Sequence, residues 1–294
     1  MGSPEVADIA KHAYDMRCDI IKMLAAAGSG HPGGSLSAAD IVATLFFSDL
    51  MAYRADDPAW DGRDRFILSK GHAAPVLYAA LAEAGYFPKE EIATLRKLGS
   101  RLQGHPDSKK LPGVEVSTGS LGQGLSISCG LAYGLARSAE ASGAVPQTVF
   151  CLMGDGEQDE GQVWEAAMFA AQYRLSNLVA IVDNNGLQID GRCANVMCFD
   201  DLAAKYDAFG WQVIQVDGHD IELTYDAIQM AKDVTCGPAV VIAHTVKGKG
   251  VSFMEDQAGW HGKAPDAEQK KQALADLEAG YARVLQELSI IKEA

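Results

Sequence analysis

Two short polar motifs form a candidate site for a metal ion and a phosphorylated ligand. Asp155 lies in a Gly-Asp-Gly tripeptide directly after the apolar run 148–153, and Asn185 closes an Asn-Asn pair after the apolar run 178–183. In open α/β sheets ligands bind beyond the carboxyl ends of the strands, where we expect both motifs to lie. A carboxylate and an amide oxygen are hard ligands that suit Mg²⁺, and we expect the backbone carbonyl of Leu187 as a third protein ligand.

The same residue types also favour tight turns, so the tripeptide alone is equally consistent with a plain turn. Asn185 at the next strand end favours the metal site over that alternative. Gly156 would let the backbone approach a diphosphate closely, and its N–H groups could bind the phosphate oxygens.

Several histidines lie on glycine-flanked loops and suggest proton transfer. His31, His72, His105 and His219 each follow a glycine, and His261 precedes one. Imidazoles donate hydrogen bonds to hydroxyl and carbonyl groups and shuttle protons near neutral pH. A single loop histidine is usually a surface residue, but this grouping favours a catalytic site.

Two glycine-rich segments could be mistaken for nucleotide-binding loops. The segment 119–124 has the order GxxGxG rather than GxGxxG and follows an irregular stretch instead of a strand, which excludes a Rossmann dehydrogenase. The segment 247–250 reads Lys-Gly-Lys-Gly without a following Ser or Thr and helix, so it is no P-loop. We expect it to begin a mobile lid over the bound ligand, and we expect this lid to end at His261.

The elements that must position these residues alternate between strand and helix. Short apolar runs at 148–153, 178–183, 212–216 and 239–243 are typical of parallel strands covered on both faces. Periodic apolar stripes predict helices at 6–27, 38–50, 73–84, 89–98, 121–141, 162–173, 200–209, 221–232 and 267–288. This pattern predicts the α/β class, a doubly wound, mostly parallel sheet flanked by helices. We expect residues 1–294 to form a single domain with a C-terminal helix from about residue 266.

Composition limits the partners of the chain. The 294 residues carry a formal net charge of -14, which argues against nucleic acid and anionic membrane surfaces as partners. A small phosphorylated ligand remains compatible, because a metal ion and backbone amides can hold it.

The six cysteines show no CxxC spacing, so buried reduced thiols are expected. Early charges at Glu5, Asp8 and Lys11 prevent an apolar signal core, and no apolar run approaches the roughly 20 residues of a membrane span. We therefore expect a cytoplasmic protein.

The chain resembles the N-terminal half of transketolase, a thiamine-diphosphate enzyme. The resemblance covers about residues 10–265 and rests on seven motifs in series, which are Gly-His-Pro-Gly-Gly at 30–34, Leu-Ser-Lys-Gly-His at 68–72, Gly-His-Pro at 104–106, Gly-Ser-Leu-Gly-Gln-Gly at 119–124, Met-Gly-Asp-Gly-Glu at 153–157, Ile-Asp-Gly at 189–191 and Trp-His-Gly at 260–262. Most full-length transketolases carry Pro where Ser120 stands here, and Ser is more typical of split enzymes. The resemblance implies the thiamine-diphosphate-binding fold, thiamine diphosphate as cofactor and Mg²⁺, Ca²⁺ or Mn²⁺ as metal.

The resemblance also implies roles for individual residues. The metal would be bound by Asp155, Asn185 and Leu187, and the catalytic residues would be His31, His72, His105, His261 and Glu160. His31 and His261 would stabilise and protonate the reacting oxygens, and His105 would hold the terminal hydroxyls of the donor. The cofactor would contact His72, Gly119, Ser120, Leu121, Asp155, Gly156, Glu157, Asn185 and His261.

Three further side chains have open or structural assignments. Glu160 opens a predicted helix, where a carboxylate can simply stabilise the helix N-terminus. The resemblance instead implies a carboxylate network between subunits, for which Glu165 is a weaker candidate. His12 and His244 match no motif and are expected to be structural, and the role of His219 stays open.

The resemblance implies that part of the active site lies elsewhere. In this family a glutamate of a second α/β domain activates the cofactor, and that domain also supplies the basic residues that bind the sugar phosphate. The chain ends at Ala294, where that domain would begin. We expect a separate C-terminal transketolase subunit as partner in an α₂β₂ assembly, which transfers a two-carbon ketol unit between sugar phosphates. Two alternatives for the function stay open: another thiamine enzyme, such as a deoxyxylulose-phosphate synthase or a transketolase for an unusual pentulose, and a non-catalytic regulatory subunit. A piece of a longer transketolase would look the same as a natural split subunit from the sequence.

Overall fold

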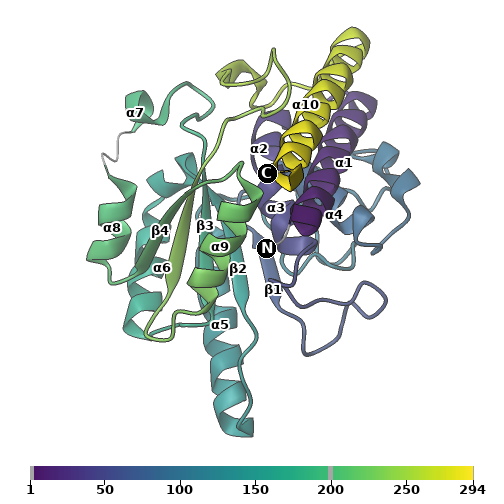
Figure 1. Cartoon of the computed structure of the whole chain (residues 1–294). Helices are drawn as coiled ribbons and strands as arrows, with labels where there is room; N and C mark the ends of the chain where they lie inside the picture. Colours follow the sequence, from purple (N-terminus) through teal and green to yellow (C-terminus); the bar gives the residue numbers. More distant parts are fainter. Residues whose placement is uncertain (1–2, 198–200, 294) are drawn as a thin grey trace.

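A parallel sheet forms the centre of the computed structural model, which describes residues 3–197 and 201–293. Within these residues the strands are β1 (Arg65–Leu68), β2 (Val149–Gly154), β3 (Leu178–Asn184), β4 (Gln212–Asp217) and β5 (Ala239–His244). They lie side by side in the order β1-β2-β3-β5-β4, and every neighbouring pair is parallel (Figure 1). All carboxyl ends therefore meet at one edge, where the candidate site is expected.

Strands β1, β2, β3 and β5 are largely buried because each face packs against its own helices, whereas the edge strand β4 has no buried residue, so the prediction of burial on both faces is wrong there. Alternate residues of β2, such as Phe150 and Leu152, join one hydrophobic core, while Val149, Cys151 and Met153 join a second. The first core is completed by α1, α3, α4, α9 and α10, and the second by α5, α6 and α8. This layering explains why the strands read as continuous apolar runs rather than alternating ones. The predicted α/β fold with a doubly wound parallel sheet is confirmed.

The longest helices of the described residues are α10, α1 and α5, with 27, 25 and 20 residues. The bounds of the helices are α1 (Ser3–Ala27), α2 (Pro32–Ser37), α3 (Ala39–Phe46), α4 (Ala74–Glu83), α5 (Gln123–Ser142), α6 (Gly161–Gln172), α7 (Cys193–Val196), α8 (Leu202–Ala208), α9 (Ile221–Lys232) and α10 (Ala267–Glu293). Short 3₁₀-helices are η1 (Gly71–Ala73), η2 (Lys89–Thr94), η3 (Gly156–Asp159) and η4 (Ala258–Trp260). Helix α10 lies along α1, so the two ends of the described chain are neighbours (Figure 1).

Most predicted elements are present, and the differences have local causes. Helix α1 ends as expected before Gly28, whose φ of 65° suits the left-handed conformation that glycine adopts without strain. The helix predicted at 89–98 is only the 3₁₀-helix η2, and Arg96 just beyond it has a left-handed φ of 61°. Strand β1 was missed, since four residues after an Asp-rich loop show no period. Asp200, the expected start of α8, lies outside the described residues.

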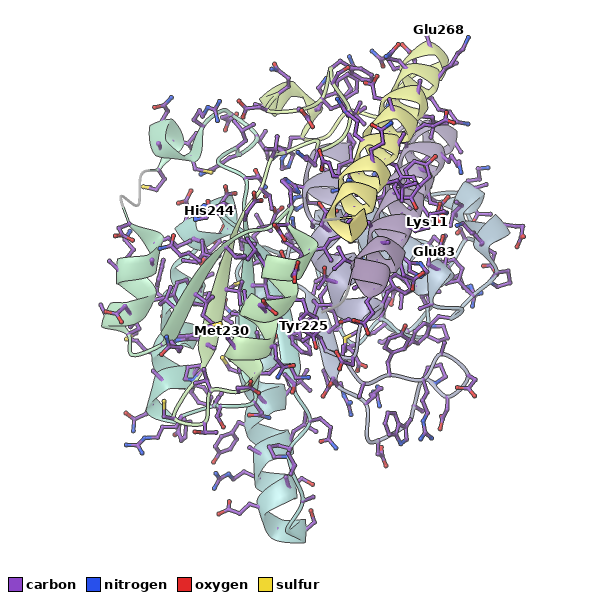
Figure 2. The ribbon with its side chains drawn as sticks, in the orientation of Figure 1. Lys11, Glu83, Tyr225, Met230, His244 and Glu268 are labelled. Atoms are coloured by element: carbon purple, nitrogen blue, oxygen red, sulfur yellow. The ribbon has the colours of Figure 1, made fainter. Side chains whose placement is uncertain are left out.

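Side-chain burial agrees with the expectation for most of the described cysteines. Cys18, Cys129, Cys151 and Cys193 are buried free thiols, whereas Cys236 is exposed, so the prediction of burial is wrong there; Cys198 lies outside the described residues. His244 lies exposed at the end of β5 (Figure 2). Helices in the described ranges are too short or too polar to cross a bilayer.

Candidate functional site

Parallel pairing of β2 with β3 brings the two predicted metal-binding motifs together. Gly154, the last residue of β2, pairs with Asp183 of β3, so Asp155 and Asn185 leave the sheet on adjacent loops. The N–H of Gly186 donates a hydrogen bond to the Asp155 carboxylate, which joins the two loops directly. The sequence prediction that these side chains share one strand edge is therefore confirmed.

The Asp155 carboxylate is buried and forms no ion pair with another described residue. It is only 2% exposed, and its Oδ1 accepts a hydrogen bond from Gly156 N at 2.8 Å. Burial and the nearby Asp183 carboxylate raise the pKa of Asp155 to about 6. A buried carboxylate held by backbone N–H groups rather than by a basic side chain is well suited to bind a cation.

Hydrogen bonds also fix the amide of Asn185. Its Nδ2 donates to Asp183 Oδ2 at 3.1 Å, while its Oδ1 accepts from Leu187 N at 3.2 Å. This pattern assigns the amide orientation, since a flipped amide would face Asp183 with an oxygen. The amide oxygen therefore lies at the N–H of Leu187.

These ligand types can be tested against Mg²⁺ and a diphosphate. Among the described residues no group of three or more His, Cys, Asp or Glu side chains is arranged to hold a metal ion. The available donors at the strand edge are one carboxylate, one amide oxygen and one backbone carbonyl, which are hard ligands. Mg²⁺ usually keeps phosphate oxygens and water among its ligands, and such a partly open donor set fits that habit. A Cβ on Gly156 would meet Gln188 Cγ at 2.9 Å, so a larger residue there would displace the Gln188 side chain. The residues fit the expected ion and diphosphate.

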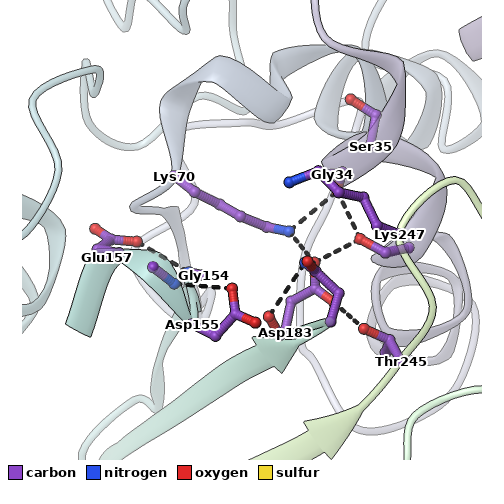
Figure 3. Close-up of polar contacts among 12 residues, drawn as sticks. Gly34, Ser35, Lys70, Gly154, Asp155, Glu157, Asp183, Thr245 and Lys247 are labelled. Atoms are coloured by element: carbon purple, nitrogen blue, oxygen red, sulfur yellow. Dashed lines mark hydrogen bonds and ion pairs between the residues drawn. The ribbon is translucent and has the colours of Figure 1, made fainter. Parts of the chain in front are cut away.

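A second polar centre, which the sequence analysis missed, lies beside the metal-binding motifs (Figure 3). Asp183 is fully buried and accepts hydrogen bonds from Ser37 Oγ at 2.6 Å, from Thr245 and from the Lys70 ammonium. Burial raises the pKa of Asp183, but Lys70 outweighs this effect and holds the pKa below its usual value. Lys70 Nζ also donates to Gly34 O at 3.0 Å. The only signal in the sequence was an Asp at the end of the apolar run 178–183, and nothing there indicated Lys70 as its partner.

Lys247 approaches the metal-binding motifs from the segment that follows β5. It is 3% exposed, and its Nζ donates to the Leu187 carbonyl at 2.8 Å. A carbonyl has two lone pairs, so this contact leaves Leu187 able to bind a metal. Burial lowers the pKa of the Lys247 ammonium, although Asp155 opposes that effect. The segment 247–261 therefore reaches the site, and its mobility as a lid stays a prediction.

The four motif histidines, which lie far apart in the sequence, converge at the same edge. The ring centroid of His31 lies 5.2 Å from that of His72, 6.5 Å from His105 and 5.5 Å from His261, and the His72 and His261 centroids are 5.0 Å apart. His31 precedes α2, His72 lies in η1, and His261 follows η4. The predicted grouping of these side chains into one cluster is confirmed, whereas their catalytic roles stay predictions.

The cluster favours neutral imidazoles. Burial, with a smaller effect from nearby cations and imidazoles, lowers the pKa of His31 to about 4 and of His261 to about 3. The same cause lowers the pKa of His72 and His105. The Nδ1 atoms of His31 and His261 are buried without a hydrogen-bond partner within the described chain. A neutral imidazole can both donate and accept, so these rings are prepared to contact a polar ligand.

We expect the free energy of unfolding to fall as the pH drops from 6.5 to about 4. In this window the unfolded chain protonates His31 and His261 near their ordinary value of 6.5, whereas the folded chain leaves them neutral. The unfolded state therefore binds more protons, and stability rises with pH. Urea unfolding between pH 7 and pH 4.5 measures the slope. His261→Gln should weaken the pH dependence and the exposed control His244→Gln should keep it; an unchanged slope in His261→Gln would contradict the assignment.

The remaining predicted residues surround the cluster in different ways. Glu157 is buried, and its two carboxylate oxygens accept from Ser69, from Gly122 N at 2.9 Å and from Gly154 N at 3.0 Å. It therefore joins the loops around the site, and a direct cofactor contact by Glu157 stays a prediction. Gly119, Ser120 and Leu121 lie in the loop before α5, with Gly119 near the His105 ring and Ser120 exposed.

Glu160 lies at the exposed N-terminus of α6. Its side chain makes no capping hydrogen bond, so the simple capping alternative lacks the contact that would support it. Glu165, deeper in α6, is also exposed. An intersubunit role for Glu160 stays a prediction.

Comparison with known proteins decides the family. Residues 10–282 match the family described as the thiamine diphosphate binding domain of transketolase. The chain belongs to the transketolase family. The transketolase resemblance of the sequence is thereby confirmed, and a thiamine-diphosphate-binding domain is what the family description names.

Relatives of this transketolase-family chain differ in length. The chain is 41% identical over 276 residues to the 6-deoxy-6-sulfo-D-fructose transketolase subunit SqwG of Clostridium sp. (strain MSTE9), covering 94% of this chain and 98% of that protein. It is 47% identical over 251 residues to human transketolase, covering 85% of this chain but 39% of that protein. A transketolase from Pichia stipitis, solved in complex with sedoheptulose 7-phosphate, matches with a TM-score of 0.85 and 32% identity over 98% of this chain and 45% of that one. The chain thus spans less than half of these longer transketolases and nearly all of SqwG.

Proposed function

We propose that this chain is the thiamine-diphosphate- and Mg²⁺-binding subunit of a transketolase whose second half is a separate polypeptide. The pair would transfer a two-carbon ketol unit from a ketose phosphate to an aldose phosphate. The observation that carries the proposal is the convergence of four neutral histidines beside the hard oxygen donors of Asp155, Asn185 and Leu187.

The cofactor site follows from the oxygen donors and the loop glycines. Asp155, Asn185 and the Leu187 carbonyl would hold Mg²⁺, and backbone N–H groups near Gly156 would hold the diphosphate. When bound, thiamine diphosphate supplies a carbon nucleophile and an electron sink for cleavage of the carbon–carbon bond next to the ketose carbonyl. Lys247, whose ammonium already lies at the Leu187 carbonyl, adds positive charge beside the diphosphate site.

The histidines would bind and protonate the sugar. Neutral His31 and His261 can donate a hydrogen bond to the substrate carbonyl oxygen and accept a proton from a hydroxyl, since each ring has both a donor and an acceptor nitrogen. His105, at the rim of the cluster, would bind the terminal hydroxyls of the donor. His72, the most deeply buried ring of the four, would contact the cofactor. His31, His72 and His261 are half-buried, whereas His105 is exposed.

The partner follows from the relatives. SqwG is named as a subunit, and this chain aligns with 98% of it, whereas it aligns with 39% of human transketolase. We infer that a second subunit supplies the cofactor-activating glutamate and the residues that bind the sugar phosphate. An α₂β₂ assembly is the expected form, with exposed Glu160 at the contact between copies.

A second candidate differs only in the donor sugar. The name of SqwG specifies 6-deoxy-6-sulfo-D-fructose, and its 41% identity to this chain makes a sulfonated ketose a reasonable donor to test. Because the group at the far end of the sugar would be recognised by the second subunit, either donor is compatible with the residues of this chain.

Reconstitution tests the proposal. The chain is mixed with the product of an adjacent gene that encodes an α/β polypeptide of about 300 residues, similar in length to this chain. Thiamine diphosphate and Mg²⁺ are then titrated by calorimetry, and ketol transfer is assayed with phosphorylated and sulfonated ketoses. We expect cofactor binding and transfer with the pair and no transfer by the chain alone. Absence of cofactor binding by a stably folded, assembled pair would favour a regulatory subunit. Ketol transfer by the chain alone would overturn the proposal that the active site is divided between two polypeptides.

A further inference from the structure

A series of hydrogen bonds between polar groups connects α1 and α3 with the segment that carries Lys247. The two terminal guanidinium nitrogens of Arg17, Nη1 and Nη2, donate to the Asp40 carboxylate at 2.7 and 2.6 Å. His219 Nδ1 lies 2.8 Å from Asp40 Oδ2, and Val246 N donates to His219 Nε2 at 2.8 Å. Arg17 and Asp40 are 8% and 6% exposed, whereas His219 is half-buried, so these contacts run from the interior toward the surface.

The donors determine the state of the His219 ring. Nε2 accepts the Val246 N–H and therefore carries no proton, which leaves the proton on Nδ1. Nδ1–H then donates to Asp40, whose negative charge is balanced by Arg17. A carboxylate that fixes the tautomer of a histidine, and with it the acceptor on the far side of the ring, is a common way to orient a functional group.

The segment held by His219 contacts three parts of the candidate site. Thr245 donates to Asp183, the Lys247 ammonium donates to the Leu187 carbonyl, and Gly248 N donates to Gly33 O at 3.0 Å. Gly33 is the second residue of α2, which begins directly after His31. The position of Val246 therefore affects how Lys247 meets the expected metal ligand.

The turn that carries His219 is anchored independently of the imidazole. Gly218 N donates to His244 O at 2.8 Å, and His219 N donates to Asp217 Oδ1 at 2.9 Å. Replacement of the ring should therefore leave the turn in place and release only the Val246 contact.

We propose that His219 is a positioning residue that holds the 245–248 segment, and with it Lys247, against the cofactor site. The role in cofactor binding rests on the function proposed above, whereas the hold on the segment does not. The sequence assigns His219 no role because nothing in the order of residues indicates that Asp40 and Val246 lie on either side of its ring.

Hydrogen–deuterium exchange of the cofactor-free chain tests the hold directly. His219→Phe keeps a planar ring but removes both nitrogens, and His244→Phe is the matched control on the neighbouring strand end. We expect exchange in the peptide covering 245–250 to be about tenfold faster in His219→Phe, the size of effect expected for one lost hydrogen bond, with peptides of β2 and β3 unchanged. His219→Gln, whose amide oxygen can accept from Val246 near the position of Nε2, should restore most of the protection. Unchanged exchange in His219→Phe would overturn the proposal.

Cofactor titration tests the consequence for the site. In the reconstituted pair, His219→Phe should weaken thiamine diphosphate binding in the presence of Mg²⁺ by about tenfold, as expected for loss of an outer residue that orients a metal site, while His244→Phe binds normally. Faster exchange with unchanged cofactor affinity would overturn the positioning role. Failure of the unaltered pair to bind the cofactor would instead reject the proposed function, and the exchange result would still decide the hold on the segment.

Discussion

Replacement of Asp155 by Ala should lower the affinity for thiamine diphosphate and Mg²⁺ by about 100-fold or more, because loss of even an outer residue at a metal site costs 10–100-fold. Asp155 is the only carboxylate among the three expected ligands, and its burial strengthens its attraction for a cation. Without it, Asn185 and the Leu187 carbonyl offer no net charge to the metal. Calorimetry of the reconstituted pair at pH 7.5 measures the loss.

The fold of this variant should survive. The raised pKa of Asp155, about 6, means that the folded chain disfavours the carboxylate charge near neutral pH, so its removal relieves a cost while two backbone N–H groups lose an acceptor. Asp207→Ala, an exposed acid on α8, is the matched control and should bind cofactor normally. Retained affinity in Asp155→Ala would refute the metal assignment.

Replacement of Lys70 by Met should lower the free energy of unfolding by about 3–5 kcal/mol, the usual cost of removing one partner from a buried ion pair. Lys70 is 2% exposed and Asp183 is fully buried, so the variant would leave a carboxylate inside the protein without its ammonium. Ser37 and Thr245 would still donate to Asp183, but neither neutralises its charge. Urea unfolding at pH 7.5 measures the difference.

Two further variants separate charge from packing. Lys97→Met, at an exposed site, should change stability by less than about 0.5 kcal/mol. Lys70→Met combined with Asp183→Asn should recover part of the loss, since the buried charge is gone. A Lys70→Met chain as stable as the unaltered one would show that Lys70 does not balance Asp183.

The sequence predicted the sheet well because its signal is local. Strands β2, β3 and β5 are nearly continuous apolar runs, the edge strand β4 is more polar, and their parallel pairing follows from the helices between them. Strand β1 shows the limit of this reasoning, since Arg65–Leu68 is recognised only once β2 lies beside it. Similarly, the sequence does not indicate the left-handed backbone at Arg96, so the helix expected at 89–98 was predicted too long.

The candidate site was predicted in part for the same reason. Asp155 and Asn185 lie at the ends of apolar strands, and a rule about strand edges brings them together. The histidine cluster could be expected from glycine-flanked motifs, but its geometry depends on four loops meeting. The Lys70–Asp183 pair and the contact of His219 with Val246 are long-range pairs of ordinary residue types, and no spacing in the sequence indicates them.

The most direct test of the account is crystallographic. Crystals of the reconstituted pair grown with thiamine diphosphate and Mn²⁺ in place of Mg²⁺ would locate the metal by its anomalous scattering. We expect one strong anomalous peak within about 2.2 Å of Asp155 Oδ, Asn185 Oδ1 and the Leu187 carbonyl oxygen, from an ion that also contacts the diphosphate. A bound diphosphate with the metal peak elsewhere, or with these three oxygens turned away from it, would contradict the metal assignment.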